Sequence, residues 1–187
     1  MKQQPVICCR ALWHTPIGPM AGSASTRGIV ELRFPPADQL VTPADLIGEV
    51  ERIDYEEHAE GAPAAARAHL AALEDYLQAY FQGEEAPAPP LDETGLSEFT
   101  RRVWRAARAV PAGETTTYRE LARRAGSPAA CRAVGGVMAA NRAVLLMPCH
   151  RVLPTGGRAE APGQFGAGTA MKSRLLRHER RLRAISV

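Results

Sequence analysis

The chain has 187 residues, 45% of them hydrophobic, and a formal net charge of +3. No run approaches the roughly 20 apolar residues that a membrane span needs, and no secretory apolar segment follows the N-terminus, so we expect a cytoplasmic protein without a membrane partner. The four cysteines are too unevenly spaced for a disulfide framework, and with the histidines they show no zinc-ligand spacing. We therefore predict reduced thiols and no bound metal.

Charge is distributed unevenly along the chain. Residues 1–91 carry 6 Lys+Arg against 13 Asp+Glu, whereas residues 92–187 carry 17 against 7. The proline-rich stretch 84–91 is typical of a semi-rigid extended linker, so we predict two domains, 1–91 and 92–187. The arginine-rich second domain indicates a polyanionic partner, although solvated helix faces would give the same composition.

The acidic domain is predicted to form a small antiparallel sheet with one helix. Apolar runs at 6–13 and 29–34 predict strands, and the turn residues between them favour a meander. Residues 35–62 show no clear pattern. Apolar residues at helical spacing between Pro63 and Phe81, followed by Gly83, predict an amphipathic helix that packs on the sheet.

The basic domain begins with two predicted helices. An apolar stripe along residues 96–110 predicts the first, with arginines on its other faces. Thr117 and Glu120 match a capping box, in which each side chain accepts a hydrogen bond from the free backbone N–H of the other residue. This second helix is expected to run to about Ala125 and to end at Gly126.

A third helix is predicted directly afterwards, with Ser127 as its cap and Pro128 at its first position. The pair of helices resembles a helix-turn-helix, a moderately specific pattern because helical hairpins that bind no DNA are common. Gly135 and Gly136 weaken this helix by roughly 1 kcal/mol each relative to alanine. The two glycines indicate that another structure approaches the backbone of this helix closely. It is either a neighbouring helix or a groove of nucleic acid, and in the second case Arg132 would project from the helix surface.

The most reactive group of side chains lies in the stretch Met147–Val152, which contains Cys149, His150 and Arg151. A cysteine that follows an apolar run is usually a small buried hydrophobe without chemistry. The alternative is a nucleophile, which requires a lowered pKa and access to a reactant.

Three segments together carry a specific resemblance: Arg132–Gly135 (R-A-V-G), Asn141, and Pro148–Val152 (P-C-H-R-V). They resemble the DNA-binding and active-site motifs of the O6-alkylguanine-DNA alkyltransferases, and the likeness extends over about residues 96–180. The resemblance implies an α+β fold: an N-terminal antiparallel sheet with a helix, and a mainly helical C-terminal domain with a winged-helix-like helix-turn-helix.

The resemblance also implies the function. Such a protein is a cofactor-free monomer that irreversibly transfers an alkyl group from O6-alkylguanine in duplex DNA to its own cysteine, with O4-alkylthymine as a further candidate substrate. Cys149 would be the nucleophile, His150 would activate it through a water, and Glu179 would orient that histidine. Tyr118 would donate a proton to the guanine.

A base inside a duplex cannot reach a buried thiol, so the nucleotide must be flipped out, here through the minor groove. By resemblance, Arg132 fills the vacated place in the stack, Asn141 ties the end of its helix to the active-site turn, and Val152 presents a carbonyl to guanine. The expected DNA-binding residues are Thr117, Arg132, Ala133, Gly135 and Arg151, and the expected substrate pocket is Asn141, Val152, Phe165 and Gly166.

The chain departs from the family at Phe165–Gly168, where relatives carry a Tyr-Ser-Gly-Gly-like loop over the extruded base. Phe165 can stack on guanine but has no hydroxyl to donate, and Gly166 keeps only its backbone N–H. We expect an altered substrate range. Three other functions stay open on sequence: a lesion-binding protein without transfer, which would lack Cys149, a cysteine hydrolase that turns over, and a helix-turn-helix regulator.

Overall fold

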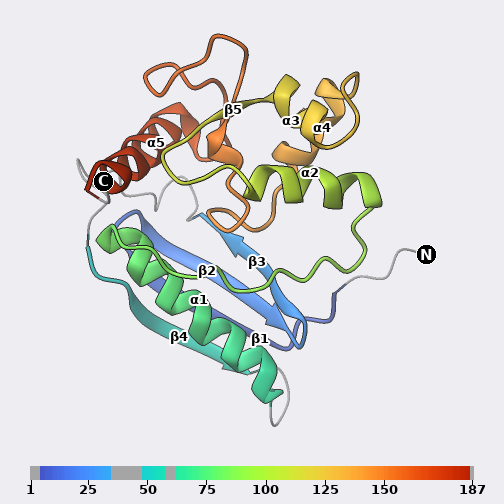
Figure 1. The fold of residues 1–187 in the computed structure, drawn as a ribbon. Coiled ribbons are helices and arrows are strands. Elements are labelled where there is room, and N and C mark those ends of the chain that lie inside the picture. The colour runs from blue at the N-terminus through green and yellow to red at the C-terminus, as the bar shows by residue number, and fades with distance from the viewer. Residues whose placement is uncertain (1–4, 35–47, 58–61, 186–187) are drawn as a thin grey trace. The chain divides into compact units, whose positions relative to one another are not determined.

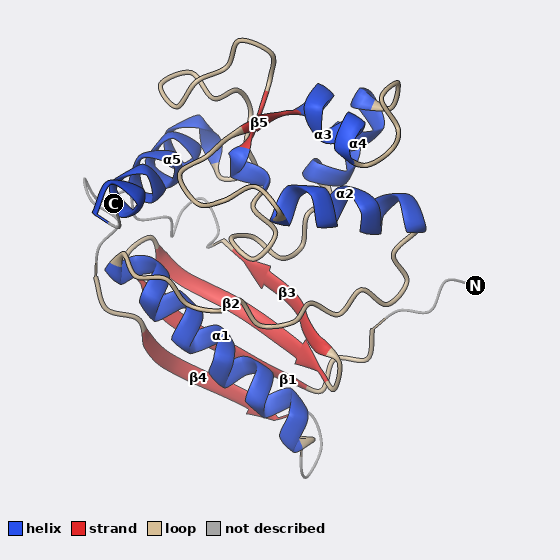
Figure 2. Ribbon diagram, viewed as in Figure 1, coloured by secondary structure: helices blue, strands red, loops and turns tan. Residues whose placement is uncertain are grey.

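The computed structural model describes residues 5–34, 48–57 and 62–185 (Figure 1). The chain forms two compact units. The first contains residues 1–95 and 142–146, and the second contains residues 96–141 and 147–187. The architecture is α+β, as the sequence predicts (Figure 2). Among the described residues, no helix is long and apolar enough to cross a membrane.

The first unit is built on an antiparallel sheet with the strand order β3-β2-β1-β4. Its strands are β1 (Cys9–Thr15), β2 (Gly18–Ser25), β3 (Gly28–Arg33) and β4 (Glu51–Glu57). The first strand begins at Cys9 rather than at residue 6, and β2 occupies the segment between the two predicted turns. The sequence missed β4, because its mostly charged residues conceal a strand that antiparallel pairing with β1 defines.

Helix α1 (Ala64–Gln82) lies along the sheet and confirms the predicted helix (Figure 1). It ends at Gly83, whose left-handed φ of 87° allows its N–H to bond the last carbonyls. Leu70, Leu73 and Leu77 are buried on the sheet side. Gly22 permits this packing, because a Cβ there would lie 2.7 Å from the Trp13 ring.

The outer edge of β3 is covered by two other segments of the first unit. At one end Ile29 N donates to Pro90 O (2.8 Å) and Asp92 N donates to Ile29 O (2.8 Å). At the other end Leu32 N donates to Arg142 O (2.9 Å) and Val144 N donates to Leu32 O (3.0 Å). Residues 142–146, which precede the reactive cysteine, therefore act as a short added strand that protects a sheet edge.

The second unit contains four helices among the described residues: α2 (Glu98–Arg108), α3 (Tyr118–Arg124), α4 (Cys131–Ala139) and α5 (Gly168–Ile185). A parallel pair of two-residue strands, β5 (Thr116–Thr117) and β6 (Val152–Leu153), joins the segment before α3 to the segment after the cysteine. A single 3₁₀ turn, Cys149–Arg151, leads into β6.

Two details of the helix-turn-helix differ from the prediction. The Thr117 hydroxyl accepts from Glu120 N (3.1 Å) as expected, but the Glu120 carboxylate accepts from Arg123 and Arg124 and does not complete the capping box. The predicted start of the next helix was also wrong. Ala130 N donates to Ser127 O in a separate turn, and α4 begins only at Cys131.

Candidate active site

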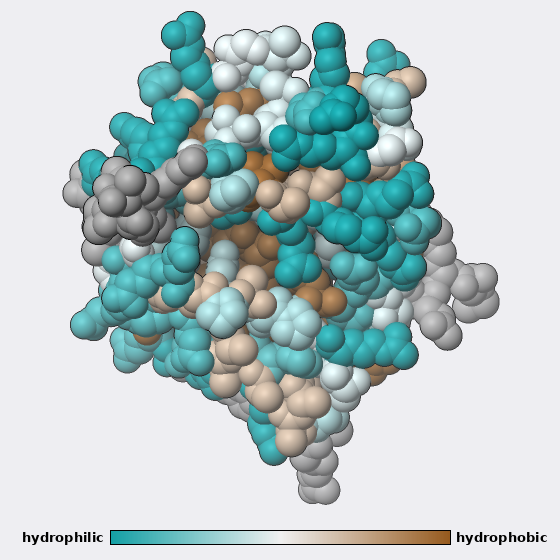
Figure 3. All heavy atoms as spheres, viewed as in Figure 1, coloured by the Kyte–Doolittle hydropathy of each residue, from teal (hydrophilic) through white to brown (hydrophobic). Residues whose placement is uncertain are grey.

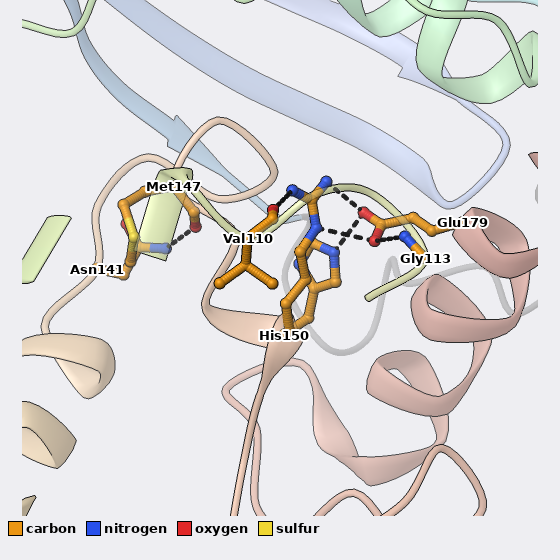
Figure 4. A network of polar contacts seen from close by, with 7 residues as sticks. Val110, Gly113, Asn141, Met147, His150 and Glu179 are labelled. Atoms are coloured by element: carbon orange, nitrogen blue, oxygen red, sulfur yellow. Dashed lines mark hydrogen bonds and ion pairs between the residues drawn. The ribbon is translucent and has the colours of Figure 1, made fainter. Parts of the chain in front are cut away.

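Cys149 lies in a tight turn and is 9% exposed. Its N–H donates to Met147 O (2.8 Å) across Pro148, whose φ of −80° and ψ of 64° form an inverse γ-turn. The side-chain amide of Asn141 donates to Met147 O (2.8 Å) and to the Cys149 Sγ (3.1 Å), as Figure 4 shows for the first of these bonds. The end of α4 is thereby joined directly to the thiol.

The β5–β6 pairing brings Tyr118 close to the turn that contains Cys149. Thr117 pairs with Leu153, so the first residue of α3 lies beside the strand that follows the cysteine turn. Burial raises the pKa of Tyr118, and negative charge on Cys149 and on Cys131 would raise it further. Tyr118 therefore keeps its hydroxyl proton and can act as a donor next to the thiol.

Glu179 is a buried hub on α5 (Figure 4). Its Oε1 lies 2.7 Å from His150 Nε2, and its Oε2 accepts from Gly113 N (3.2 Å). Arg151 donates to both oxygens, from Nε (2.9 Å) and from Nη2 (2.8 Å). Burial alone would raise the pKa of Glu179, but the charges and hydrogen bonds of His150 and Arg151 outweigh it and hold this pKa well below its usual range.

Arg151 does not point to the surface, in contrast to the DNA contact expected from the sequence. Besides its two bonds to Glu179, its Nη1 donates to Val110 O (2.7 Å), and only 11% of the side chain is exposed. A guanidinium that is held this way has few donors left for phosphate. We assign Arg151 to the support of Glu179 rather than to DNA binding.

Glu179 fixes the orientation of the His150 ring. Its carboxylate is ionised and can only accept, so Nε2 carries the hydrogen that lies between them. The other ring nitrogen, Nδ1, is buried and has no hydrogen-bond partner among the described residues. Nδ1 is thus the nitrogen left available for chemistry on a ring that Glu179 holds in place.

Lys172 is a residue of the site that the sequence analysis missed. It is 1% exposed on α5, its Nζ donates to Val152 O (2.8 Å), and the Nζ lies 5.9 Å from the centre of the Phe165 ring. A signal was present: Lys172 falls in the helical stripe of buried Leu175, Leu176 and Glu179. Lysine is rarely fully buried unless it is paired.

Cys149 and Lys172 perturb each other. Burial raises the pKa of the Cys149 thiol, and this effect is opposed by the Asn141 hydrogen bond, the Lys172 charge and nearby backbone N–H groups. Burial lowers the pKa of Lys172, and negative charge on Cys149 opposes that change. Burial thus favours the protonated thiol, whereas the polar groups around it favour the thiolate.

Helix α4 presents a slim outer face. Arg132 and Ala133 are exposed, whereas Val134 and Met138 are buried. A Cβ built on Gly135 or Gly136 would meet no atom of the described residues within 4 Å. The interpretation of tight helix packing is therefore wrong, and the small residues leave open space outside the helix. Hydrophilic side chains dominate the neighbouring face over α2 and α3 in Figure 3.

The loop from Pro154 to Gly168 ends at Phe165 and Gly166, which the resemblance implies line the substrate pocket. Gly157 and Gly163 pack on the Pro154 ring, where a Cβ would approach to 3.0 and 3.1 Å. A Cβ on Gly166, in contrast, would meet nothing within 4 Å. Phe165 is half-buried over Lys172. Among the described residues, no group of three or more His, Cys, Asp or Glu side chains could hold a metal ion.

Comparison with known sequences gives consistent matches. Residues 98–181 match the family model described as 6-O-methylguanine DNA methyltransferase, DNA binding domain. The methylated-DNA–protein-cysteine methyltransferase of Mycolicibacterium paratuberculosis is 42% identical over 128 residues, which cover 68% of this chain and 74% of that protein. Its counterpart in Cricetulus griseus is 34% identical over 183 residues, covering 90% and 80% respectively.

Solved structures agree with these matches. The crystal structure of Mycobacterium tuberculosis O6-methylguanine methyltransferase has a TM-score of 0.65 at 28% identity and covers 92% of this chain and 93% of its own. The crystal structure of Mycobacterium tuberculosis OGT in complex with DNA has a TM-score of 0.65 at 29% identity, with coverage of 91% and 93%.

Proposed function

Because the chain belongs to the methylated-DNA–protein-cysteine methyltransferase family, we propose that it repairs alkylated DNA by direct reversal. In this function Cys149 takes the alkyl group from O6-alkylguanine irreversibly, so that each molecule acts once. The observation that carries the proposal is the position of Cys149: a buried thiol that accepts a hydrogen bond from Asn141 and adjoins the His150–Glu179 pair. O4-alkylthymine, which offers the same kind of carbon to a thiolate, is the second substrate that we propose.

The reaction is a displacement at the alkyl carbon. The Cys149 thiolate forms the S–C bond while the bond from carbon to guanine O6 breaks and leaves its electron pair on the base. His150 takes the Cys149 proton through a water, and Tyr118 donates a proton to guanine. The proton held by His150 then restores the Tyr118 hydroxyl, so that the proton lost from sulfur ends on guanine. The thioether is stable, so the thiol is not regenerated and no cofactor is needed.

Recognition of the lesion uses the open face of α4. Arg132 projects from a helix whose exposed alanine and glycines let a nucleic-acid backbone approach closely. We propose that Thr117, Ala133 and Gly135 also contact the DNA. We propose that Arg132 replaces the flipped nucleotide in the stack, and that Val152, Asn141, Phe165 and Gly166 receive the extruded base.

The proposed arrangement assigns different work to the two domains. Residues 92–187 bind DNA and carry out the transfer, and residues 1–91 support them. The protein would act as a monomer in the cytoplasm, where bacterial DNA is accessible. Cys149 disfavours a lesion-binding protein without transfer activity, since such proteins lack the acceptor cysteine.

Mass spectrometry tests the proposal directly. The protein is incubated with a duplex that contains a single O6-methylguanine, and the peptide that contains Cys149 is analysed. We expect a mass gain of one methyl group, a stoichiometry that never exceeds one, and no gain with Cys149→Ser or with an unmodified duplex. An unmodified Cys149 overturns the proposal. Tight binding without transfer would support a lesion sensor, and repeated turnover would support a hydrolase.

A further inference from the structure

Glu120 binds two arginines of its own helix instead of completing the cap of α3. Its Oε2 accepts from Arg123 Nε (2.8 Å), and its Oε1 accepts from Arg123 Nη2 (2.8 Å) and from Arg124 Nε (2.8 Å). Bonds between two charged groups are roughly twice as strong as the neutral bond that the N–H of Thr117 would supply. Glu120, Arg123 and Arg124 therefore form one cluster, which we call the Glu120 cluster.

The Glu120 cluster lies at the surface and is reversible. The side chains of Arg123, Arg124 and Glu120 are 69%, 44% and 33% exposed. Hydrogen bonds from Arg123 and then Arg124 lower the pKa of Glu120 to about 2, so the carboxylate is charged at neutral pH. Ion pairs in contact with water contribute little to stability and exchange readily. Another anion that approaches the helix can therefore replace Glu120 as the partner of either arginine.

The cluster belongs to the helix-turn-helix that is proposed to bind DNA. Arg123 and Arg124 lie in the last turn of α3, and residues 125–130 then lead to Arg132 at the start of α4. Helices α3 and α4 pack against each other (Figure 1). In this motif the first helix crosses the DNA backbone when the second enters a groove. The anions that approach the Glu120 cluster are therefore phosphates beside the groove that receives α4.

Glu120 occupies the edge of Arg123 that a phosphate would need. A guanidinium donates through Nε and Nη2 in a planar fork, and this fork matches two oxygens of a carboxylate or of a phosphate equally well. In the free protein both donors are bonded to Glu120. The carboxylate also repels the phosphate through its own charge. A phosphate must therefore displace Glu120, and lie near its charge, before it gains the two arginines.

We propose that Glu120 is a determinant of specificity: it withholds Arg123 and Arg124 from the phosphates of undamaged DNA and so keeps non-specific binding weak. The inference rests on the proposed function, because a protein that repairs rare lesions must leave intact DNA quickly. Contacts with phosphate carry no information about the base. Two more of them would prolong each encounter with intact DNA without improving recognition of the flipped nucleotide.

Binding of an undamaged duplex, measured by fluorescence anisotropy between about 50 and about 200 mM salt, tests the proposal. Glu120→Gln removes the charge and releases the arginines. Glu98→Gln, which removes an exposed carboxylate from the first turn of α2, is the matched control for net charge. Both substitutions are then repeated in a protein that carries Arg123→Gln and Arg124→Gln. Thermal unfolding shows whether each variant is folded, and Glu120→Ala replaces Glu120→Gln should the latter not fold.

We expect Glu120→Gln to bind the undamaged duplex about threefold to tenfold more tightly than the wild type at the lowest salt concentration. The slope of log K against log salt should steepen by about one to two, because up to two more phosphates are contacted. Glu98→Gln should leave the slope unchanged. In the protein without the two arginines, Glu120→Gln should gain much less affinity.

Two results would overturn the proposal. An unchanged affinity and slope in folded Glu120→Gln would show that the arginines are not withheld. An equal gain in affinity with and without Arg123 and Arg124 would show that Glu120 acts through repulsion of phosphate alone.

Methyl transfer separates this inference from the proposed function. Transfer from an O6-methylguanine duplex is timed with and without a large excess of undamaged DNA. The competitor should slow Glu120→Gln about threefold more than it slows the wild type, because the variant is held longer on intact DNA. Equal slowing would refute the role of Glu120 and leave the proposed function standing. Absence of transfer in the wild type would refute the proposed function, and the binding measurements would still decide whether Glu120 withholds the arginines.

Discussion

Asn141 and Cys149 are joined by a hydrogen bond in which the amide Nδ2 lies 3.1 Å from the thiol sulfur. The same nitrogen donates to Met147 O at 2.8 Å, so one side chain both favours the thiolate and closes the loop of residues 142–146. The end of the proposed DNA-binding helix and the reactive sulfur are thus linked by a single side chain. Loss of this amide should affect chemistry and stability together.

Asn141→Ala should slow methyl transfer by about tenfold, because the thiolate loses a hydrogen-bond donor, and should lower the free energy of unfolding by about 1–2 kcal/mol. Asn141→Asp should be slower still, since a carboxylate repels a thiolate at the same distance. Single-turnover kinetics and urea denaturation measure the two effects. Transfer by Asn141→Asp at the wild-type rate would contradict this role.

Glu179→Gln should lower the free energy of unfolding by about 3 kcal/mol at pH 7, because it leaves the Arg151 guanidinium buried without its counter-ion. Denaturant titration measures the change. The matched control is Glu160→Gln, since Glu160 is an exposed carboxylate at 3.8 Å from Arg180 and should change stability little. Equal effects of the two substitutions would show that the buried network contributes nothing.

The stability of the wild type should fall in acid because of the same carboxylate. The pKa of Glu179 lies below its ordinary value of 4.5 in the folded protein, so the unfolded chain binds the extra proton. Its stabilising contribution is fully present above about pH 4.5 and is lost as the pH falls below that value. Glu179→Gln should flatten this part of the curve between pH 5 and about pH 3, as measured by urea denaturation.

Gly135→Ala offers a test of the open face of α4. In the free protein it should stabilise the helix by up to about 1 kcal/mol, because the structure has room for the added methyl group. Affinity for duplex DNA should nevertheless fall, because the methyl group occupies the space through which the backbone would approach. Thermal unfolding and DNA titration measure the two opposite effects. A stabilised variant that binds DNA normally would place the DNA elsewhere.

Arg132→Ala should slow transfer from duplex DNA by at least about tenfold, since the vacated stack is left unfilled and flipping costs a few kcal/mol. Transfer from a single-stranded oligonucleotide should change much less. Arg177→Ala, which removes an exposed arginine from α5, is the matched control. Equal slowing on duplex and single strand would indicate that Arg132 binds phosphate and takes no part in flipping.

Phe165→Tyr restores the hydroxyl that the resemblance leads one to expect in the loop. We expect it to change the ratio of transfer rates on O6-methylguanine and on a bulkier O6-alkyl substrate. The reason is that there is open space next to Phe165, since a Cβ on Gly166 would meet no atom of the described residues within 4 Å. Competition between the two oligonucleotides measures this ratio. Wild-type rates on both substrates would remove Phe165 from the determinants of specificity.

Sequence patterns predicted the features that depend on local chemistry. The helix that ends at Gly83 and the Thr117 cap were visible because a left-handed glycine and an N-cap hydroxyl act over a few residues. The motif around Cys149 was visible because its residues are contiguous. Strand β4 was not, because its pairing with β1 depends on a partner about forty residues away.

The parts of the site that were missed depend on tertiary packing. Arg151 was expected to bind DNA, because arginine is a common phosphate-binding residue. Only the fold shows that its guanidinium instead donates to the buried Glu179 carboxylate. Lys172 lies in an apolar helical stripe. A lysine at such a position is unusual, so the sequence pattern alone could have identified Lys172 as a candidate site residue. The pairing of Leu32 with Arg142 and Val144 has no local sequence signal, because it joins segments more than one hundred residues apart.

The strand that residues 142–146 add to β3 limits how the protein can be shortened. A fragment that starts at residue 96 would keep every catalytic side chain, yet Val144 N and Arg142 O would lose their bonds to Leu32. Leu145, held at a left-handed φ of 65° by the bond from Leu146 N to Val144 O, would then be free to relax. A minimal reagent based on this protein therefore needs the edge of β3 as well as the motif, supplied either in the same chain or as a separate fragment.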